Sequence, residues 1–290
     1  PTFTHASNSL DARSLAIVPP GAWIVTPFHL APTSTRRFTL SPTQSGTAML
    51  ELHHLSKTYP GPVHALKDVS FTVESGLFGL LGPNGSGKST LMRILAGLLE
   101  PTAGYALLDG HDITKTPERI WSQLGYLPQD FDFYPNQTGE AMLAYLLRLK
   151  GVEAPGGLRA LCRSLLEQVN LTAAAGRPVR TYSGGMRRRL GIAQAIAGSP
   201  RLLIVDEPAA GLDPDERMRL YRLLARLAQD RVVLLSTHNV VDAAMVCPQL
   251  AIMRYGSVLA IQSPAEACAE IAGTIYEGHV GPDQYAALQE

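Results

Sequence analysis

Cysteine is scarce in this chain of 290 residues, which carries three: Cys162, Cys247 and Cys268. They lie far apart and show no C-x-x-C spacing, so the sequence indicates neither a zinc site nor a disulfide framework. Reduced thiols that pack as small apolar side chains are the better interpretation.

Long apolar runs are also missing, since a membrane-spanning helix needs roughly 18 or more consecutive apolar residues. The nearest candidate, Leu15 to Ala31, is interrupted by three prolines and by His29. It also lacks the basic start and the unbroken apolar run of a secretory signal. We therefore expect any attachment to a membrane to come from another protein.

Net charge is absent, because 25 basic side chains balance 25 acidic ones. Nucleic-acid-binding proteins usually show a basic stripe, so we expect no nucleic-acid partner. Hydrophobic residues make up 46% of the chain and charged residues 17%, which is ordinary for a folded α/β protein and excludes wholesale disorder.

The first 48 residues differ in character from the rest. They are rich in Ser, Thr and Pro and show no sustained period of either kind. We predict that residues 1–48 are a disordered extension that contributes nothing to the fold. Strand-like sequence begins at Met49, which we expect to lie close to the functional start of the protein.

From Met49 onward, strand-like and helix-like segments alternate, which favours a mostly parallel sheet with crossover helices. The predicted strands are Val69–Val73, Leu77–Leu81, Leu202–Val205 and Val232–Leu235, and Ser89–Leu99 is a predicted helix. The last two strands are continuous apolar runs, which are typical of strands covered on both faces.

The sequence between Gln129 and Tyr182 has a different pattern. Ala141–Leu149 and Leu158–Val169 favour helices, and no convincing strand lies among them. We predict a helical subdomain inserted at about residues 130–182. Residues 263–290 form a C-terminal tail of helix-like composition.

The strongest local signal is a phosphate-binding loop. Its residues match G-x-x-x-x-G-K-[ST] and are Gly82, Pro83, Asn84, Gly85, Ser86, Gly87, Lys88 and Ser89, followed by Thr90. The loop follows a predicted strand and precedes a predicted helix, which is the context that supports an ATP site. Lys88 is expected to reach the β- and γ-phosphates, and the Ser89 hydroxyl to bind Mg²⁺.

A pair of carboxylates follows the predicted strand Leu202–Val205. Ligands bind at the carboxyl ends of strands in open α/β sheets, so Asp206 is placed to hold the Mg²⁺ shell. Glu207 is placed to polarise an attacking water. An Asp-Glu pair is common at strand ends, and it gains weight here because a phosphate-binding loop precedes it.

The segment T-Y-S-G-G-M-R-R-R at residues 181–189 resembles the signature of ABC ATPases, whose commonest form is Leu-Ser-Gly-Gly-Gln. Most P-loop enzymes lack this element. The resemblance covers residues 49–262, with the motifs in the family's order. It implies that Ser183, Gly184 and Gly185 open a helix whose N-terminus caps the γ-phosphate bound by the opposite subunit.

The resemblance implies roles for four further residues. Gln129 matches the Q-loop glutamine that senses Mg²⁺ and water, and His238 matches the switch histidine that contacts the γ-phosphate. Asp213 matches the D-loop that crosses to the partner. Tyr59 matches the aromatic residue that stacks on adenine, a contact worth about 1–3 kcal/mol per base.

Tyr182 and Met186 replace the usual Leu and Gln of the signature. Neither position supplies a group that faces phosphate. For Arg187–Arg189 we predict a solvated helix face with one guanidinium paired internally, rather than a nucleic-acid patch.

The predicted fold is that of an α/β P-loop NTPase of the ABC-ATPase type, with an antiparallel β-subdomain near Leu50–Val73 and the helical insert. The resemblance, which is greatest to ATPases of ABC-2-type exporters, implies an ATPase. It would bind ATP and Mg²⁺ and act as a head-to-tail homo- or heterodimer under a separate transmembrane permease. The expected location is the cytoplasmic face of the plasma membrane.

Two other functions remain open. The first is a soluble regulatory ABC ATPase without a permease. Such proteins usually carry two nucleotide domains, a long coiled-coil insert or zinc-binding insertions, and none of these is found in the sequence. The second is an inactive binding module, which the presence of both Lys88 and Glu207 opposes.

Overall fold

The structure is a computed structural model that describes residues 48–61, 63–115 and 121–270. The predictions for residues 1–47 and 271–290 therefore lie outside the described residues. Ala48, which the sequence assigned to the extension, is fully buried, and its backbone N–H donates to Ser75 Oγ at 2.7 Å. The folded part of the chain thus includes the residue before Met49.

The strands are β1 (Met49–Tyr59), β2 (Val63–Glu74), β3 (Gly76–Leu81), β4 (Ala103–Leu108), β5 (His111–Asp112), β6 (Leu124–Leu127), β7 (Leu202–Val205), β8 (Val232–Thr237), β9 (Gln249–Arg254) and β10 (Ser257–Gln262). The α-helices are α1 (Lys88–Leu95), α3 (Gly139–Leu149), α4 (Leu158–Gln168), α5 (Gly184–Ile196), α6 (Pro214–Leu227), α7 (Val240–Val246) and α8 (Pro264–Glu270). Short 3₁₀ turns are η1 (Trp121–Gln123), η2 (Thr172–Ala174) and η3 (Val179–Thr181).

The central sheet has six strands in the order β10-β9-β3-β8-β7-β6. All pairs are parallel except the edge pair β9–β10. Every residue of β7 and β8 is buried, which confirms that these apolar runs are covered on both faces. Alternate side chains enter two cores: Leu203 and Val205 pack with the helices, whereas Leu202 and Ile204 face the second sheet.

The second sheet is antiparallel, with the order β2-β1-β4-β5. The sequence predicted an antiparallel subdomain near residues 50–73 but did not identify β4 and β5. Gly104 lies in β4 with φ 80°, and a Cβ there would clash with the carbonyl oxygen of His54 on β1. The pairing of β4 therefore depends on close backbone contact, which leaves little trace in the hydrophobic pattern.

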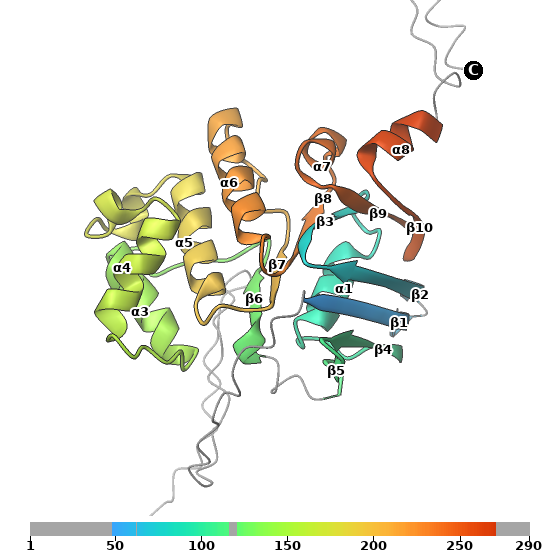
Figure 1. The fold of residues 1–290 in the computed structure, drawn as a ribbon, viewed down its shortest axis with the longest axis horizontal. Coiled ribbons are helices and arrows are strands. Elements are labelled where there is room, and N and C mark those ends of the chain that lie inside the picture. The colour runs from blue at the N-terminus through green and yellow to red at the C-terminus, as the bar shows by residue number, and fades with distance from the viewer. Residues whose placement is uncertain (1–47, 62, 116–120, 271–290) are drawn as a thin grey trace, which may run out of the picture.

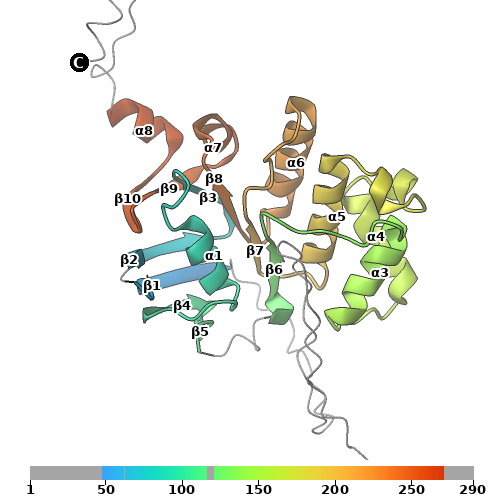
Figure 2. The same cartoon turned by 180° about the vertical axis from the view of Figure 1, so that it is seen from behind.

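Helix α1 packs with the antiparallel sheet and one face of the central sheet in a shared core, and Figures 1 and 2 show it beside β1 and β2 from opposite sides. The predicted helix Ser89–Leu99 was too long. Helix α1 ends at Leu95, and Gly97 follows with φ 69°. Leu98 continued the apolar pattern, but its side chain is 61% exposed, so periodicity alone misled the prediction.

Helices α3, α4 and α5 pack together on the side of the molecule away from the antiparallel sheet (Figures 1 and 2). The part of residues 129–182 that the structure describes contains no strand, apart from one isolated bridge between Thr138 and Pro178. Tyr182 is buried and its hydroxyl donates to Ala174 O at 2.8 Å. The unusual signature tyrosine therefore anchors this helical layer.

Candidate functional site

Most of the predicted site residues follow the carboxyl ends of four neighbouring parallel strands. The phosphate-binding loop follows β3, His238 follows β8, Asp206 follows β7, and Gln129 lies two residues beyond β6. Strand ends that are adjacent in a parallel sheet meet at one edge. The fold therefore gathers side chains from widely separated parts of the sequence.

Close backbone contacts shape the phosphate-binding loop. Gly87 has φ 106°, and a Cβ there would meet Ala65 O at 2.6 Å, while a Cβ at Gly82 would clash with Met253 O. Helix α1 begins immediately after Gly87 without a side-chain cap, so the N–H groups of its first turn are available to an anion. This arrangement fits the phosphates of a nucleotide.

Lys88 is the buried cation of this loop, with 4% of its surface exposed. Its Nζ donates to Gly82 O at 2.6 Å and to Pro83 O at 3.1 Å. Burial lowers the pKa of Lys88, and the nearby carboxylates of Glu207 and Asp206 oppose that shift. An ammonium held this way is well placed to shift onto phosphate oxygens.

Asp206 and Glu207 are held by Ser236, a residue of β8 that the sequence analysis did not single out. Ser236 Oγ donates to Asp206 Oδ1 at 2.5 Å and accepts from the backbone N–H of Glu207 at 2.8 Å. All three residues are buried. The sequence signal for Ser236 was its place two residues before His238.

Glu207 connects the loop lysine with the predicted switch histidine. Its Oε1 lies 3.8 Å from Lys88 Nζ, and its Oε2 lies 2.6 Å from His238 Nδ1. Glu207 is 7% exposed, whereas the His238 side chain is 55% exposed. Both line a cleft of about 200 Å³, so the carboxylate is buried and still reachable by a water molecule.

The described residues hold no group of three or more His, Cys, Asp or Glu that would bind a metal without help. Ser89, Asp206 and Gln129 offer hydroxyl, carboxylate and amide oxygens, which are the ligands that Mg²⁺ prefers. A Mg²⁺ ion here would complete its shell with phosphate oxygens and water, as it commonly does in nucleotide sites.

Tyr59 ends β1 at the turn to β2 and is half-buried, with Lys57 Nζ 5.6 Å from its ring centroid. Strand β2 also supplies Ala65, whose carbonyl packs against Gly87. The same hairpin therefore carries the aromatic residue and touches the phosphate-binding loop.

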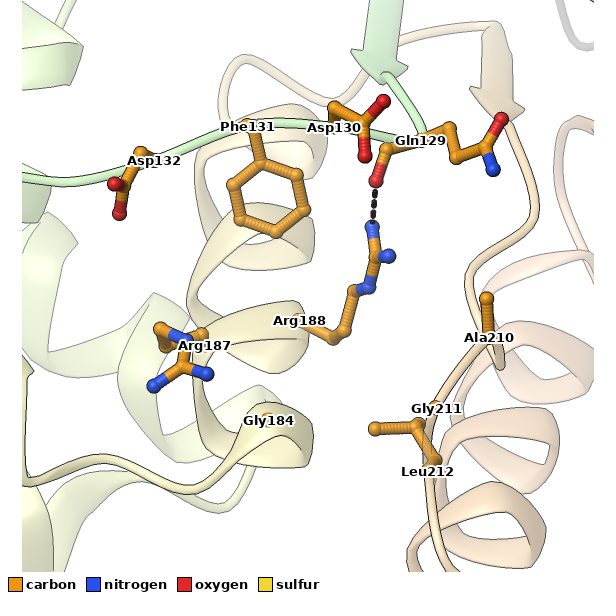
Figure 3. A pocket seen from close by; sticks show the side chains of 10 residues that line it. All are labelled: Gln129, Asp130, Phe131, Asp132, Gly184, Arg187, Arg188, Ala210, Gly211 and Leu212. Carbon is orange, nitrogen blue, oxygen red and sulfur yellow. Dashed lines mark hydrogen bonds between the residues drawn. The ribbon is translucent and has the colours of Figure 1, made fainter. Parts of the chain in front are cut away.

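The signature residues lie elsewhere. Ser183 caps the N-terminus of α5 and accepts from Met186 N at 3.1 Å. Gly184 lines a cleft of about 350 Å³ together with Gln129–Asp132, Arg187, Arg188 and Ala210–Leu212 (Figure 3). None of the residues that line this cleft belongs to the phosphate-binding loop.

Asp213 lies just beyond that cleft. It caps the N-terminus of α6, and its Oδ1 accepts from Glu216 N at 2.8 Å. Its side chain is exposed. The contact of Asp213 with a second subunit stays a prediction.

The prediction of a solvated arginine face with one internally paired guanidinium was wrong in part, because two of the three guanidinium groups pair internally. Arg187 is exposed and donates to Tyr182 O, but the other two guanidinium groups turn inward. Arg188 donates to Gln129 O at 2.6 Å, and Arg189 forms an ion pair of 3.3 Å with Glu216. Helix α5 packs against neighbours on several sides, so little of it faces solvent.

No helix in the described ranges is both long and apolar enough to cross a membrane.

Comparison with known proteins gives a consistent result. The family model described as ABC transporter matches residues 66–210. The chain is 40% identical over 215 residues to an uncharacterised ABC transporter ATP-binding protein, YxlF, of Bacillus subtilis (strain 168), covering 72% of this chain and 69% of that protein. It is 37% identical over 221 residues to ABC transporter A family member 7 of Arabidopsis thaliana, covering 73% of this chain. The chain spans about a quarter (24%) of that plant protein.

Solved structures show the same fold. The structure of cbiO1 from Clostridium perfringens, part of the ABC transporter complex cbiONQ, superimposes with a TM-score of 0.71 at 25% identity, covering 78% of this chain and 92% of that one. A dimeric ATP-binding cassette in a post-hydrolysis state with ADP and Pi gives a TM-score of 0.66 at 24% identity, covering 74% and 98%. These likenesses confirm the predicted fold class.

Proposed function

Because this chain belongs to the ABC transporter family and has the fold of its ATPase domains, we propose that it binds and hydrolyses ATP and thereby powers a separate transmembrane partner. The observation that carries the proposal is the Glu207 carboxylate, buried between Lys88 and His238 beside the phosphate-binding loop. The residue proposed to activate water thus lies next to the residues proposed to bind phosphate.

Different residues of the chain would have different roles in binding and hydrolysing ATP. The loop N–H groups and Lys88 would hold the phosphates, and Tyr59 would stack on the adenine. Ser89 and Asp206 would hold Mg²⁺, which would supply positive charge to neutralise the phosphates. Glu207 accepts a proton from the attacking water, and His238 orients that carboxylate through the 2.6 Å contact. Gln129 would sense the metal and the water, as its match to the Q-loop glutamine implies.

We further propose that the working form is a head-to-tail dimer. The supporting observation is that α5 and α1 lie on different sides of the chain in both views, with the signature away from the loop (Figures 1 and 2). Two subunits would each supply Ser183, Gly184 and Gly185 to the other's nucleotide. Closure on ATP and release after hydrolysis are then states of different affinity that drive a conformational cycle.

A permease partner would place the chain at the cytoplasmic face of a membrane. The support is family membership, together with the likeness to cbiO1, which is itself part of an ABC transporter complex. Isolation of the chain from native membranes with a bound transmembrane subunit is the expected result. Recovery of the chain only in the soluble fraction would favour the regulatory alternative.

Glu207→Gln tests the chemistry. The amide keeps the shape of the side chain and loses the base, so ATP and Mg²⁺ still bind while turnover falls at least about a hundredfold. Phosphate release and size-exclusion chromatography with ATP measure turnover and a trapped dimer. Turnover within twofold of wild type would remove Glu207 from this role.

A further inference from the structure

The Q-loop backbone is held by a side chain from the signature helix. Arg188, on the second turn of α5, donates from Nη1 to Gln129 O at 2.6 Å and to Pro128 O at 3.4 Å. Figure 3 shows the guanidinium reaching the Gln129 carbonyl while the Gln129 side chain points away from it. The arginine thus fixes the peptide and leaves the amide side chain free to act.

Stacking makes this contact directional. The Arg188 guanidinium lies 5.0 Å from the centroid of the Phe131 ring, and burial lowers the pKa of Arg188 against the opposing charges of Asp130 and Asp206. A planar guanidinium that stacks and donates in a fixed fork has one preferred orientation, which a lysine ammonium lacks. The contact therefore fixes the position of the Gln129 backbone relative to α5, in addition to placing a positive charge there.

Other α5 residues hold the same strand end. Gln194 Nε2 donates to Tyr126 O at 3.1 Å, and Gly191 is so close to Leu127 and Phe131 that an added Cβ would meet Leu127 Cδ1 at 2.6 Å. Helix α5 thus contacts residues 126–131 along its length, and Arg188 is its contact nearest to Gln129.

We propose that Arg188 is a positioning residue: it couples the place of the signature helix to the backbone at Gln129, so that Gln129 is aligned for hydrolysis only when α5 is correctly seated. This inference rests on the proposed ATPase function, because Gln129 acts there on Mg²⁺ and water. Arg188 itself touches no reacting atom and acts through Gln129.

A double-mutant cycle in ATP turnover tests the coupling. Arg188→Gln and Gln129→Ala each lower kcat about tenfold, with the KM for ATP within twofold of wild type. The double variant falls no more than twofold below Gln129→Ala, since residues that act through one another are not additive. Arg188→Lys keeps the charge but not the stacking, and recovers only part of the loss.

Amide hydrogen exchange gives a readout that needs no turnover. Exchange at residues 127–132 is about tenfold faster in Arg188→Gln, with α3 and α4 unchanged. The matched control is Arg226→Gln, which alters a guanidinium on α6 that also donates to a backbone carbonyl, that of Gln168, at 2.6 Å. It leaves both kcat and exchange at residues 127–132 within twofold of wild type.

The outcomes separate two failures. Additive losses of kcat, or unchanged exchange at residues 127–132, overturn the role of Arg188 and leave the ATPase proposal standing. Wild-type turnover in Gln129→Ala would show that Gln129 is not needed for hydrolysis. It would overturn the proposed role of Gln129 and, with it, the positioning role of Arg188. If Arg188→Gln does not fold, Phe131→Leu removes the stacking instead, and its kcat loss must vanish in the Gln129→Ala background for the proposal to stand.

Discussion

Glu207 adopts a backbone conformation that few glutamates adopt. Its φ is 45°, in the left-handed region, where a non-glycine residue costs about 1–3 kcal/mol. Such a cost persists only when the surroundings fix the residue. The bond from its N–H to Ser236 Oγ and the contacts of its carboxylate with Lys88 and His238 supply that restraint.

Ser236→Ala tests whether this restraint matters. The hydroxyl serves two buried partners, so its loss leaves Asp206 Oδ1 and the Glu207 N–H without it and costs about 1–3 kcal/mol of folding free energy. We expect kcat to fall about tenfold with little change in ATP affinity. Denaturant unfolding and ATP turnover measure the two effects. A variant that matches wild type in both would show that Glu207 is positioned without Ser236.

Gly87 and Gly85 form a matched pair of loop glycines. Both have positive φ, but a Cβ at Gly87 would meet Ala65 O at 2.6 Å, whereas a Cβ at Gly85 meets nothing within 4 Å. Gly87→Ala is therefore expected to cost about 1–3 kcal/mol more than Gly85→Ala, because only the first displaces backbone. Thermal unfolding of the two variants measures the difference. Equal losses would mean that φ strain alone sets the cost.

At the scale of elements, the sequence predicts the helices and strands that are marked by a local hydrophobic pattern. The strands β3, β7 and β8 are recoverable because continuous apolar runs mark burial on both faces. The early end of α1 and the pairing of β4 were missed because Gly97 and Gly104 act through backbone conformation, which periodicity does not record. For Gly104 the cause is a tertiary contact, the close approach of its backbone to His54 on β1.

In the candidate site, too, some residues could be predicted from the sequence and others only from the packing. Motif spacing predicted roles for Lys88, Asp206 and Glu207, and the fold brings Lys88 to within 3.8 Å of the Glu207 carboxylate. Ser236 and the inward turn of Arg188 were not identified, because a serine in a strand and an arginine on a helix are ordinary by themselves. Only the packing of β8 beside β7, and of α5 on the loop after β6, gives them partners.

Lys150 offers a test at the C-terminal end of the signature helix. Its Nζ donates to the carbonyls of Gln194, Ala195 and Ala197 at 3.4, 3.3 and 3.1 Å. Burial lowers the pKa of Lys150 to about 8, from 10.5. Below about pH 8 both folded and unfolded chains carry the proton, and the unfavourable burial of the charge is fully present.

Between about pH 8 and 10.5 the unfolded chain holds the proton and the folded chain does not, so this group's contribution to stability rises with pH. We expect the free energy of unfolding of wild type, relative to Lys150→Met, to increase by about 1 kcal/mol from about pH 7.5 to about pH 10. Urea unfolding across that range measures it. A constant difference between wild type and Lys150→Met would contradict the linkage.

At the scale of the whole molecule, the proposed head-to-tail dimer would build each of its two ATP sites from the phosphate-binding loop of one chain and the signature of the other. The first residues of helix α5 line a cleft, and no residue of the phosphate-binding loop lines it. In such a dimer, a mutation in one motif of one subunit would impair only the ATP site to which that motif contributes. This property can be tested by mixing two inactive variants.

Ser183→Arg places a large cation at the start of α5, and we expect it to leave ATP binding by the monomer nearly intact while abolishing closure and hydrolysis. Lys88→Ala removes the loop ammonium and abolishes binding at its own loop. Mixed dimers contain one site built from the intact loop of the first variant and the intact signature of the second. Closure with ATP, measured by size-exclusion chromatography or energy transfer between labelled subunits, is expected in the mixture and in neither parent alone. Since the two lesions fall in the same site of a mixed dimer only if Ser183 serves the opposite nucleotide, a mixture as inactive as both parents would argue that each chain uses its own signature.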